Sequence, residues 1–220
     1  EYTGSWPKRH AWTANTISHN TLQIDDTRSA SSPGGKIELF VTEAPLRVIE
    51  VDAPKAYKNL QTYRRTVAMI DVGDRDSYVL DVFRARGGRR HRLSWHGAAE
   101  TARLDGVALL EQETGTFAGP DVPFAKLEGE NADSYRQSGF TYLYQIERST
   151  SRVDAPYTVD WKIHDRRGRI RDGDVPHLRL HALTACDEVA LATGDAPNKL
   201  LRPRYVIQSR LGKNLESQFI

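Results

Sequence analysis

Alternation of apolar and polar side chains is the feature that most limits what this chain can fold into. Its clearest case is residues 157–163, where apolar side chains occupy every second position: Tyr157, Val159, Trp161 and Ile163. Successive side chains of a β-strand point to opposite faces, so this pattern gives one apolar and one polar face. Similar alternation recurs in residues 78–83 and 140–146. The pattern is typical of antiparallel sheets with one buried face.

Further strands are predicted between turn-forming sequences such as Pro33-Gly34-Gly35 and Gly87-Gly88, at 19–25, 36–42, 46–52, 62–72, 89–96, 187–193 and 204–211. Helical periodicity is nearly absent, and Gly106 argues against a helix over 98–110. We therefore predict one all-β domain over residues 1–220. It should be a large antiparallel two-sheet β-sandwich with about a dozen strands and less than about a tenth of its residues in helix. Inward faces should bury Tyr78, Leu80, Val82, Tyr157, Val159, Trp161 and Ile163.

Composition excludes several classes of function. The net charge of +2 gives no basis for nucleic-acid binding, and no apolar run is long enough to cross a membrane as a helix. Cys186 is the only cysteine, so no intrachain disulfide can form, and no nucleophile, phosphate or dinucleotide motif is present. Both ends read as cuts through structure, so we expect a fragment of a longer multidomain protein.

The triplet His19-Asn20-Thr21 opens into the apolar positions Leu22 and Ile24, and an aromatic and basic run, residues 6–12, precedes it. Strand-like segments follow at 63–71, 78–83, 91–97 and 212–219. In this order, these segments resemble the C-terminal β-sandwich of heparinase II/III-like polysaccharide lyases.

The resemblance implies a parent protein that cleaves a uronate-containing acidic polysaccharide, such as a glycosaminoglycan or alginate, by β-elimination. It places the catalytic base in an upstream helical toroid, so we expect no catalytic residue in residues 1–220 and no activity from them alone. It makes His19 a ligand of zinc or calcium in the intact parent only, with no cofactor in the fragment. It also implies a periplasmic or extracellular location. The alternative is a non-catalytic β-sandwich module that binds glycan or only supports a neighbouring domain.

The candidate substrate-binding residues are His19, Asn20, His96 and three arginines. His19 and Asn20 belong to the triplet that the resemblance places at the substrate cleft, although His19 could equally be a strand-edge histidine bonded to backbone. His96 points away from Trp95, whose own face favours a core role. Arg86, Arg89 and Arg90 flank a predicted Gly87-Gly88 hairpin, and guanidinium groups bind carboxylates and sulfates in a bidentate manner. A solvated hairpin tip is the other interpretation of these arginines.

Overall fold

The computed structural model describes residues 8–31, 34–127, 136–163, 165, 168–196 and 201–220. Strands account for 47% and helix for 7%, which confirms the all-β prediction. The described ranges contain four short helical turns, namely η1 (Arg9–Thr13), η2 (Thr16–Ser18), η3 (Pro54–Ala56) and η4 (Phe140–Tyr142). They contain 14 strands: β1 (Leu22–Ile24), β2 (Lys36–Val41), β3 (Leu46–Asp52), β4 (Thr62–Asp71), β5 (Ser77–Arg86), β6 (Arg90–His96), β7 (Arg103–Asp105), β8 (Leu109–Glu111), β9 (Leu143–Ser149), β10 (Tyr157–Lys162), β11 (His177–Ala182), β12 (Glu188–Gly194), β13 (Arg204–Leu211) and β14 (Glu216–Phe219).

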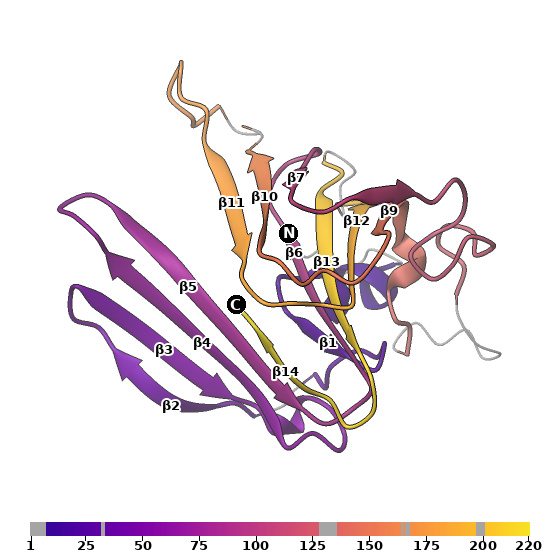
Figure 1. Ribbon diagram of the computed structural model, residues 1–220, viewed down its shortest axis with the longest axis horizontal. Helices are drawn as coiled ribbons and strands as arrows, with labels where there is room; N and C mark the ends of the chain where they lie inside the picture. Colours follow the sequence, from indigo (N-terminus) through magenta and orange to yellow (C-terminus); the bar gives the residue numbers. More distant parts are fainter. Residues whose placement is uncertain (1–7, 32–33, 128–135, 164, 166–167, 197–200) are drawn as a thin grey trace.

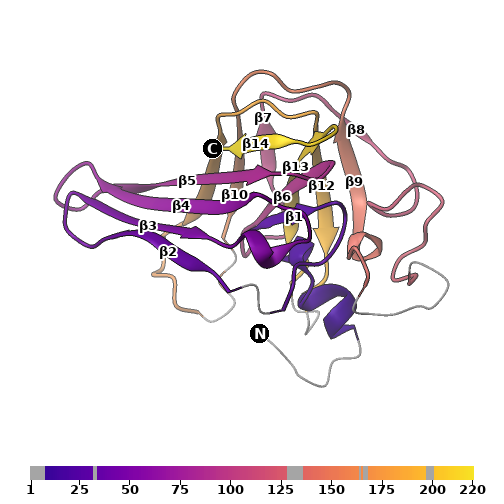
Figure 2. The same cartoon turned by 90° about the horizontal axis from the view of Figure 1, so that it is seen from below.

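The strands form two layers, and the second layer is divided (Figures 1 and 2). A six-stranded sheet, in the order β1-β6-β13-β12-β9-β8, makes the first layer. A five-stranded sheet (β14-β5-β4-β3-β2) and a three-stranded sheet (β11-β10-β7) make the second. The amide of Leu183, just after β11, donates to the carbonyl of Ile220, just after β14, and so joins the two parts of this layer. All strand pairs are antiparallel, as predicted.

One face of the six-stranded sheet packs on the second layer. Under the three-stranded sheet, Val159 and Trp161 pack with Val206 of β13. Under the five-stranded sheet, Phe83 and Phe219 belong to a cluster that includes Leu22 and Leu93. Each large apolar side chain that becomes fully buried stabilises the fold by about 1.5–3 kcal/mol. The predicted core residues Tyr157, Val159 and Trp161 are buried and are therefore among the residues that hold the layers together.

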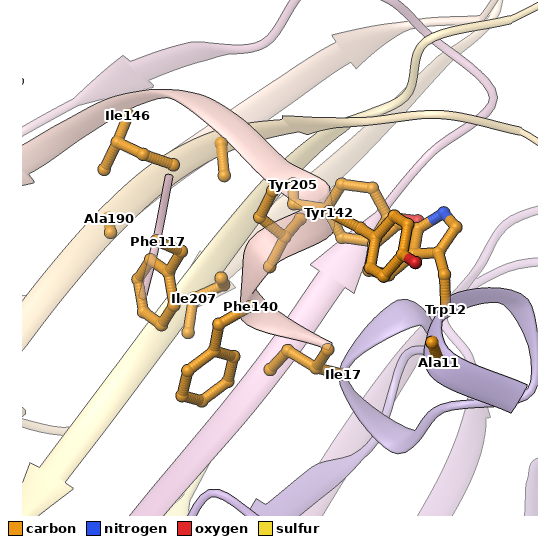
Figure 3. Packing of buried hydrophobic residues seen from close by; sticks show 12 residues of the cluster. Ala11, Trp12, Ile17, Phe117, Phe140, Tyr142, Ile146, Ala190, Tyr205 and Ile207 are labelled. Carbon is orange, nitrogen blue, oxygen red and sulfur yellow. The ribbon is translucent and has the colours of Figure 1, made fainter. Parts of the chain in front are cut away.

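The opposite face of the six-stranded sheet is covered by the N-terminal segment and by residues around η4. Phe117 and Phe140 lie there beside Ile207 of β13, and Trp12 packs on Tyr205 of the same strand, as Figure 3 shows. This cover brings the segment that precedes β1 close to β12 and β13, more than 170 positions later in the chain.

The predicted inward face of β5 is wrong, because Phe83 and Ala85 join the cluster between the layers and alternation places Tyr78, Leu80 and Val82 on the opposite face. Val82 is buried, but Leu80 is only partly buried and Tyr78 is 52% exposed. The hairpin ends of β2–β5 project away from the six-stranded sheet, so nothing in the described part of the chain covers them (Figure 1). One face of this overhang exposes apolar side chains that the strand register places together: Ile37, Phe40, Ile49, Met69 and Val79.

The first predicted strand is shorter than residues 19–25. β1 contains only Leu22, Gln23 and Ile24, all buried, and the positive φ angles of Asp25 and Asp26 (50° and 56°) turn the chain away. His19 lies before the strand, after η2. The prediction for Ile163 is met in part, since it is half-buried beside the core. His164 lies outside the described residues. No helix in the described residues has the length and apolarity that a membrane crossing needs.

Candidate functional site

A pocket lies where the N-terminal segment meets the end of β6 and the loop after β12. It has a volume of about 320 Å³, and we call it the histidine pocket after two of its lining residues. Its walls include Trp12, His19, His96, Asp195, Leu201 and Tyr205. The structure therefore brings together two of the predicted residues, His19 and His96, from positions 77 residues apart.

Asn20 joins the segments that carry these histidines. Its side-chain Nδ2 donates to the carbonyl of His96 (3.1 Å), and its Oδ1 accepts from the amide of His96 (2.8 Å). The carbonyl of Asn20 accepts from Nη1 of Arg65 at 2.8 Å. Both polar atoms of the Asn20 side chain are thus engaged with backbone, so Asn20 fixes the pocket rather than lining it.

Both histidines of the pocket have a lowered pKa. Burial is the main cause for each, because an apolar environment disfavours the imidazolium. The charge of Arg28 lowers the pKa of His19 further, and His19 lowers that of His96. Hydrogen bonds with the backbone of Thr13 (His19), and of Gly97 and Ser18 (His96), act in the opposite direction. At neutral pH both rings are therefore uncharged and can accept a proton or a hydrogen bond.

Aromatic side chains form one wall of the pocket. The ring of His96 lies 4.6 Å from that of Tyr205, and Trp12 is tilted against Tyr205 at 5.7 Å. On its other side Trp12 stacks on Tyr142 at 5.9 Å, an arrangement visible in Figure 3. Burial raises the pKa of Tyr205, so its phenol stays protonated. Apolar walls beside a few polar groups are typical of small-molecule sites.

Asp195 places one carboxylate at the pocket. Its backbone carbonyl accepts from Nε1 of Trp12 (2.7 Å), and its Oδ1 accepts from the hydroxyl of Tyr144 (2.9 Å). Burial first, and then this hydrogen bond, raises the pKa of Tyr144 to about 12. Tyr144 is therefore a permanent donor near neutral pH and holds Asp195 in place.

His19 also lines a second hollow of about 350 Å³ on the side of the five-stranded sheet. Thr21, Arg28 and Tyr63 contribute to its walls. The Tyr63 hydroxyl donates to the carbonyl of Leu22 at 2.5 Å, and burial is the main reason that its pKa rises to about 12. His19 is thus positioned between two hollows, outside the hydrophobic clusters.

The predicted arginines lie elsewhere. Arg90 starts β6 and His96 ends it, so at about 3.3 Å per residue some 20 Å separate them along the strand. Arg90 binds Asp26 (2.7 Å), and Arg86 lies 3.9 Å from Glu216. The backbone amide of Arg89 donates to Asp25, and its side chain is exposed. None of the three lines the histidine pocket, and their binding of substrate stays a prediction.

Within the described residues, no three side chains of His, Cys, Asp or Glu lie close enough together to hold a metal ion. The described part of the chain therefore has too few ligands for a complete metal site. Structural zinc usually has four protein ligands. A metal at His19 therefore needs ligands from outside the described part of the chain.

Sequence reasoning missed several pocket residues. Trp12 was noticed only as part of an aromatic run, and Asp195 and Tyr205 were not singled out. Asp195 follows β12 and Tyr205 lies in β13, and no local pattern tells which end of these strands meets the N-terminal segment. Cys186 is buried, and burial raises its pKa to about 11, in keeping with a packing role.

Residues 1–161 match the family model described as "Heparinase II/III-like, C-terminal". Among solved structures, the chain resembles the heparan sulfate lyase HepC of Pedobacter heparinus with 17% identity and a TM-score of 0.43, over 93% of this chain and 23% of that one. A mutant of HepC gives 17% identity and a TM-score of 0.47, over 100% of this chain and 26% of that one. A protein described as a heparinase III gene product gives 14% identity and a TM-score of 0.35, over 97% of this chain and 27% of that one. The chain thus spans about a quarter of the length of these proteins. Because all three TM-scores are below 0.5, no residue role is carried over from these structures to this chain. No curated protein sequence matches the chain significantly.

Proposed function

Because the chain belongs to the heparinase II/III-like family, as its C-terminal domain, we propose that it is the β-sandwich of a polysaccharide lyase that cleaves uronate-containing acidic polysaccharide by β-elimination. The observation that carries the proposal is the histidine pocket, in which two neutral histidines, one carboxylate and two aromatic rings surround a space of about 320 Å³. In this proposal the pocket forms part of the substrate cleft.

β-Elimination places clear demands on such a cleft. A base takes the proton from the carbon next to the uronate carboxylate, a carbon–carbon double bond forms, and the bond to the leaving glycosidic oxygen breaks. That oxygen then takes up a proton. Negative charge grows on the carboxylate during proton removal, so donors placed near it lower the barrier.

The residues of this chain are suited to holding and orienting the sugar. A neutral imidazole has one donor and one acceptor, and the backbone contacts of His19 with Thr13 and of His96 with Ser18 and Gly97 fix how these two rings are oriented toward the pocket. Trp12 and Tyr205 are almost fully buried, so their edges shape the pocket and their packing keeps its wall rigid. Asn20 keeps His96 in register with His19. The proton-abstracting base belongs, in this proposal, to a helical toroid domain of the same protein.

A divalent metal, zinc or calcium, is part of the proposal for the complete protein only. His19 would be its ligand from this chain, as a neutral imidazole. Such a metal would hold the triplet segment in place, and we assign it no step of the reaction. A periplasmic or extracellular location fits a substrate that is a large acidic polymer.

The test is an assay of the protein at its full natural length against a panel of polymers: heparan sulfate, hyaluronan, alginate and a neutral glucan. Release of an unsaturated uronate is followed by its ultraviolet absorbance. We expect activity on at least one acidic polymer and none on the neutral glucan. His96→Ala should lower kcat/KM by at least about tenfold, the range for one lost positioning or hydrogen-bonding group.

His181→Ala is the matched control, because His181 is exposed on β11 and does not line the histidine pocket. It should leave the rate unchanged. Binding of acidic polymers without any unsaturated product would favour the alternative, a glycan-binding module. If the His96→Ala variant is as active as the parent, the histidine pocket is not part of the substrate cleft.

A further inference from the structure

A second polar surface lies on the outer face of the three-stranded sheet. Val159 and Trp161 of β10 point into the core, so the alternation of the strand turns Asp160 and Lys162 outward. Strand register places Asp160 between Arg103 of β7 and Arg179 of β11. These side chains and His177 line a shallow hollow of about 420 Å³, which we call the basic pocket.

The carboxylate of Asp160 organises this pocket. It accepts hydrogen bonds from Nδ1 of His177 and from Nε of Arg179, the second at 2.9 Å. The bond from His177, and then that from Arg179, lowers the pKa of Asp160, so the carboxylate stays ionised and fixes both partners. Only 14% of the Asp160 side chain is exposed, whereas 58% of Arg179 remains accessible.

Two further cations have no strong partner. Arg103 lies 2.8 Å from Asp105, but 77% and 52% of these two side chains are exposed, and such surface pairs contribute little. Lys162 is exposed and forms no ion pair with any described residue. Three basic side chains thus line the pocket together with one carboxylate, that of Asp160, and positive charge stays in excess even when Asp105 is counted beside Arg103.

We propose that the basic pocket binds the anionic groups, carboxylate or sulfate, of an acidic polysaccharide at a site separate from the histidine pocket. This inference rests on the proposed function for the class of its ligand. Arg103 and Arg179 come from strands two places apart, so they are separated by about 10 Å across the sheet. That separation lets two anionic groups of one polymer be bound together. The open shape of the hollow suits a chain that lies across the sheet.

The experiment compares two double variants of the protein at its full natural length. Arg103→Ala with Lys162→Ala removes two cations from the basic pocket. Arg75→Ala with Lys213→Ala removes two exposed cations that line neither pocket and has the same effect on net charge. All four side chains are exposed, so both variants should keep the melting temperature of the parent.

Binding is measured by titration calorimetry with dextran sulfate (sulfate only), alginate (carboxylate only) and dextran (no charge), at two salt concentrations. We expect the basic-pocket variant to bind at least one anionic polymer about fivefold to tenfold more weakly than the parent, as the loss of two surface charge contacts implies. The control variant should bind as the parent does, and dextran should not bind. The two anionic polymers tell which group is recognised.

The outcomes separate this proposal from the proposed function. If the parent cleaves an acidic polymer and the basic-pocket variant binds both anionic polymers as tightly as the control, the basic pocket is refuted while the lyase function stands. If no polymer is cleaved but anionic binding is weakened only in the basic-pocket variant, the pocket is supported and the lyase function fails. Equal weakening in both double variants would show a non-specific charge effect and overturn the proposal.

Discussion

Nδ1 of His91 lies 2.8 Å from the hydroxyl oxygen of Ser217 and so ties the first layer to the last strand of the second. Nε2 of the same ring lies 2.6 Å from the carbonyl of Gly87. Because a carbonyl can only accept, Nε2 carries the proton and Nδ1 accepts from the Ser217 hydroxyl. His91 is fully buried at the start of β6, where the hairpin from β5 turns into the six-stranded sheet.

We expect His91→Ala to lower the free energy of unfolding by about 2–4 kcal/mol, because it leaves a cavity, a buried Ser217 hydroxyl and a partly buried Gly87 carbonyl without their hydrogen bonds. Urea unfolding followed by tryptophan fluorescence measures the change. His181→Ala, an exposed histidine, should change stability by less than about 0.5 kcal/mol. Equal effects of the two substitutions would show that the His91 contacts do not hold the layers together.

Stability should fall on mild acidification. The pKa values of His19, His91 and His96 are all lowered in the folded protein, first of all by burial. Below the unfolded value of about 6.5 the unfolded chain binds protons that the folded protein does not, so stability is full above that pH and is lost toward the folded pKa values. Melting temperatures between about pH 7.5 and pH 5 test this sign. A melting temperature that rises over this range as the pH falls would contradict it.

The sequence predicted those strands whose faces differ clearly. Residues 157–162 were placed correctly because Val159 and Trp161 face a covered core while Asp160 and Lys162 lie on the outer face of the sheet. Alternation alone does not account for Gln23, which is fully buried and whose Nε2 donates to the carbonyl of Ser138, 115 positions away (2.8 Å). It also failed at Tyr78, because both faces of β5 carry apolar side chains and it is Phe83 and Ala85, on the face opposite to Tyr78, that pack between the layers. Only part of the histidine pocket was predicted from the sequence, for a similar reason. His19 and His96 were chosen one by one, and only the pairing of β1 with β6 and the docking of Asp195 bring them together.

Asn20 should matter for the geometry of the histidine pocket. Asn20→Ala removes the two hydrogen bonds to the backbone of His96, and we expect it to lower the free energy of unfolding by about 1–3 kcal/mol. Asn20→Asp keeps the acceptor for the His96 amide but turns a carboxylate oxygen toward the His96 carbonyl, so it should not restore the parent stability. Thermal unfolding of both variants measures these effects. Full stability of Asn20→Asp would show that the bond to the His96 carbonyl contributes nothing.

The overhang of the five-stranded sheet should behave as an exposed apolar surface. Phe40 and Val79 are 65% and 62% exposed on the same face of the sheet, close to Ile49 and Met69. Contiguous apolar patches of this kind bind hydrophobic dyes and other apolar surfaces. We expect the double variant Phe40→Ser with Val79→Ser, made in residues 1–220, to lower the fluorescence of bound anilinonaphthalene sulfonate at least about twofold. The free energy of unfolding of this double variant should differ from that of the parent by less than about 1 kcal/mol, because each exposed side chain contributes little.

Leu110→Ser is the control, since Leu110 is 69% exposed on β8, away from the overhang. The same loss of fluorescence in the control would mean that the dye does not report on the overhang.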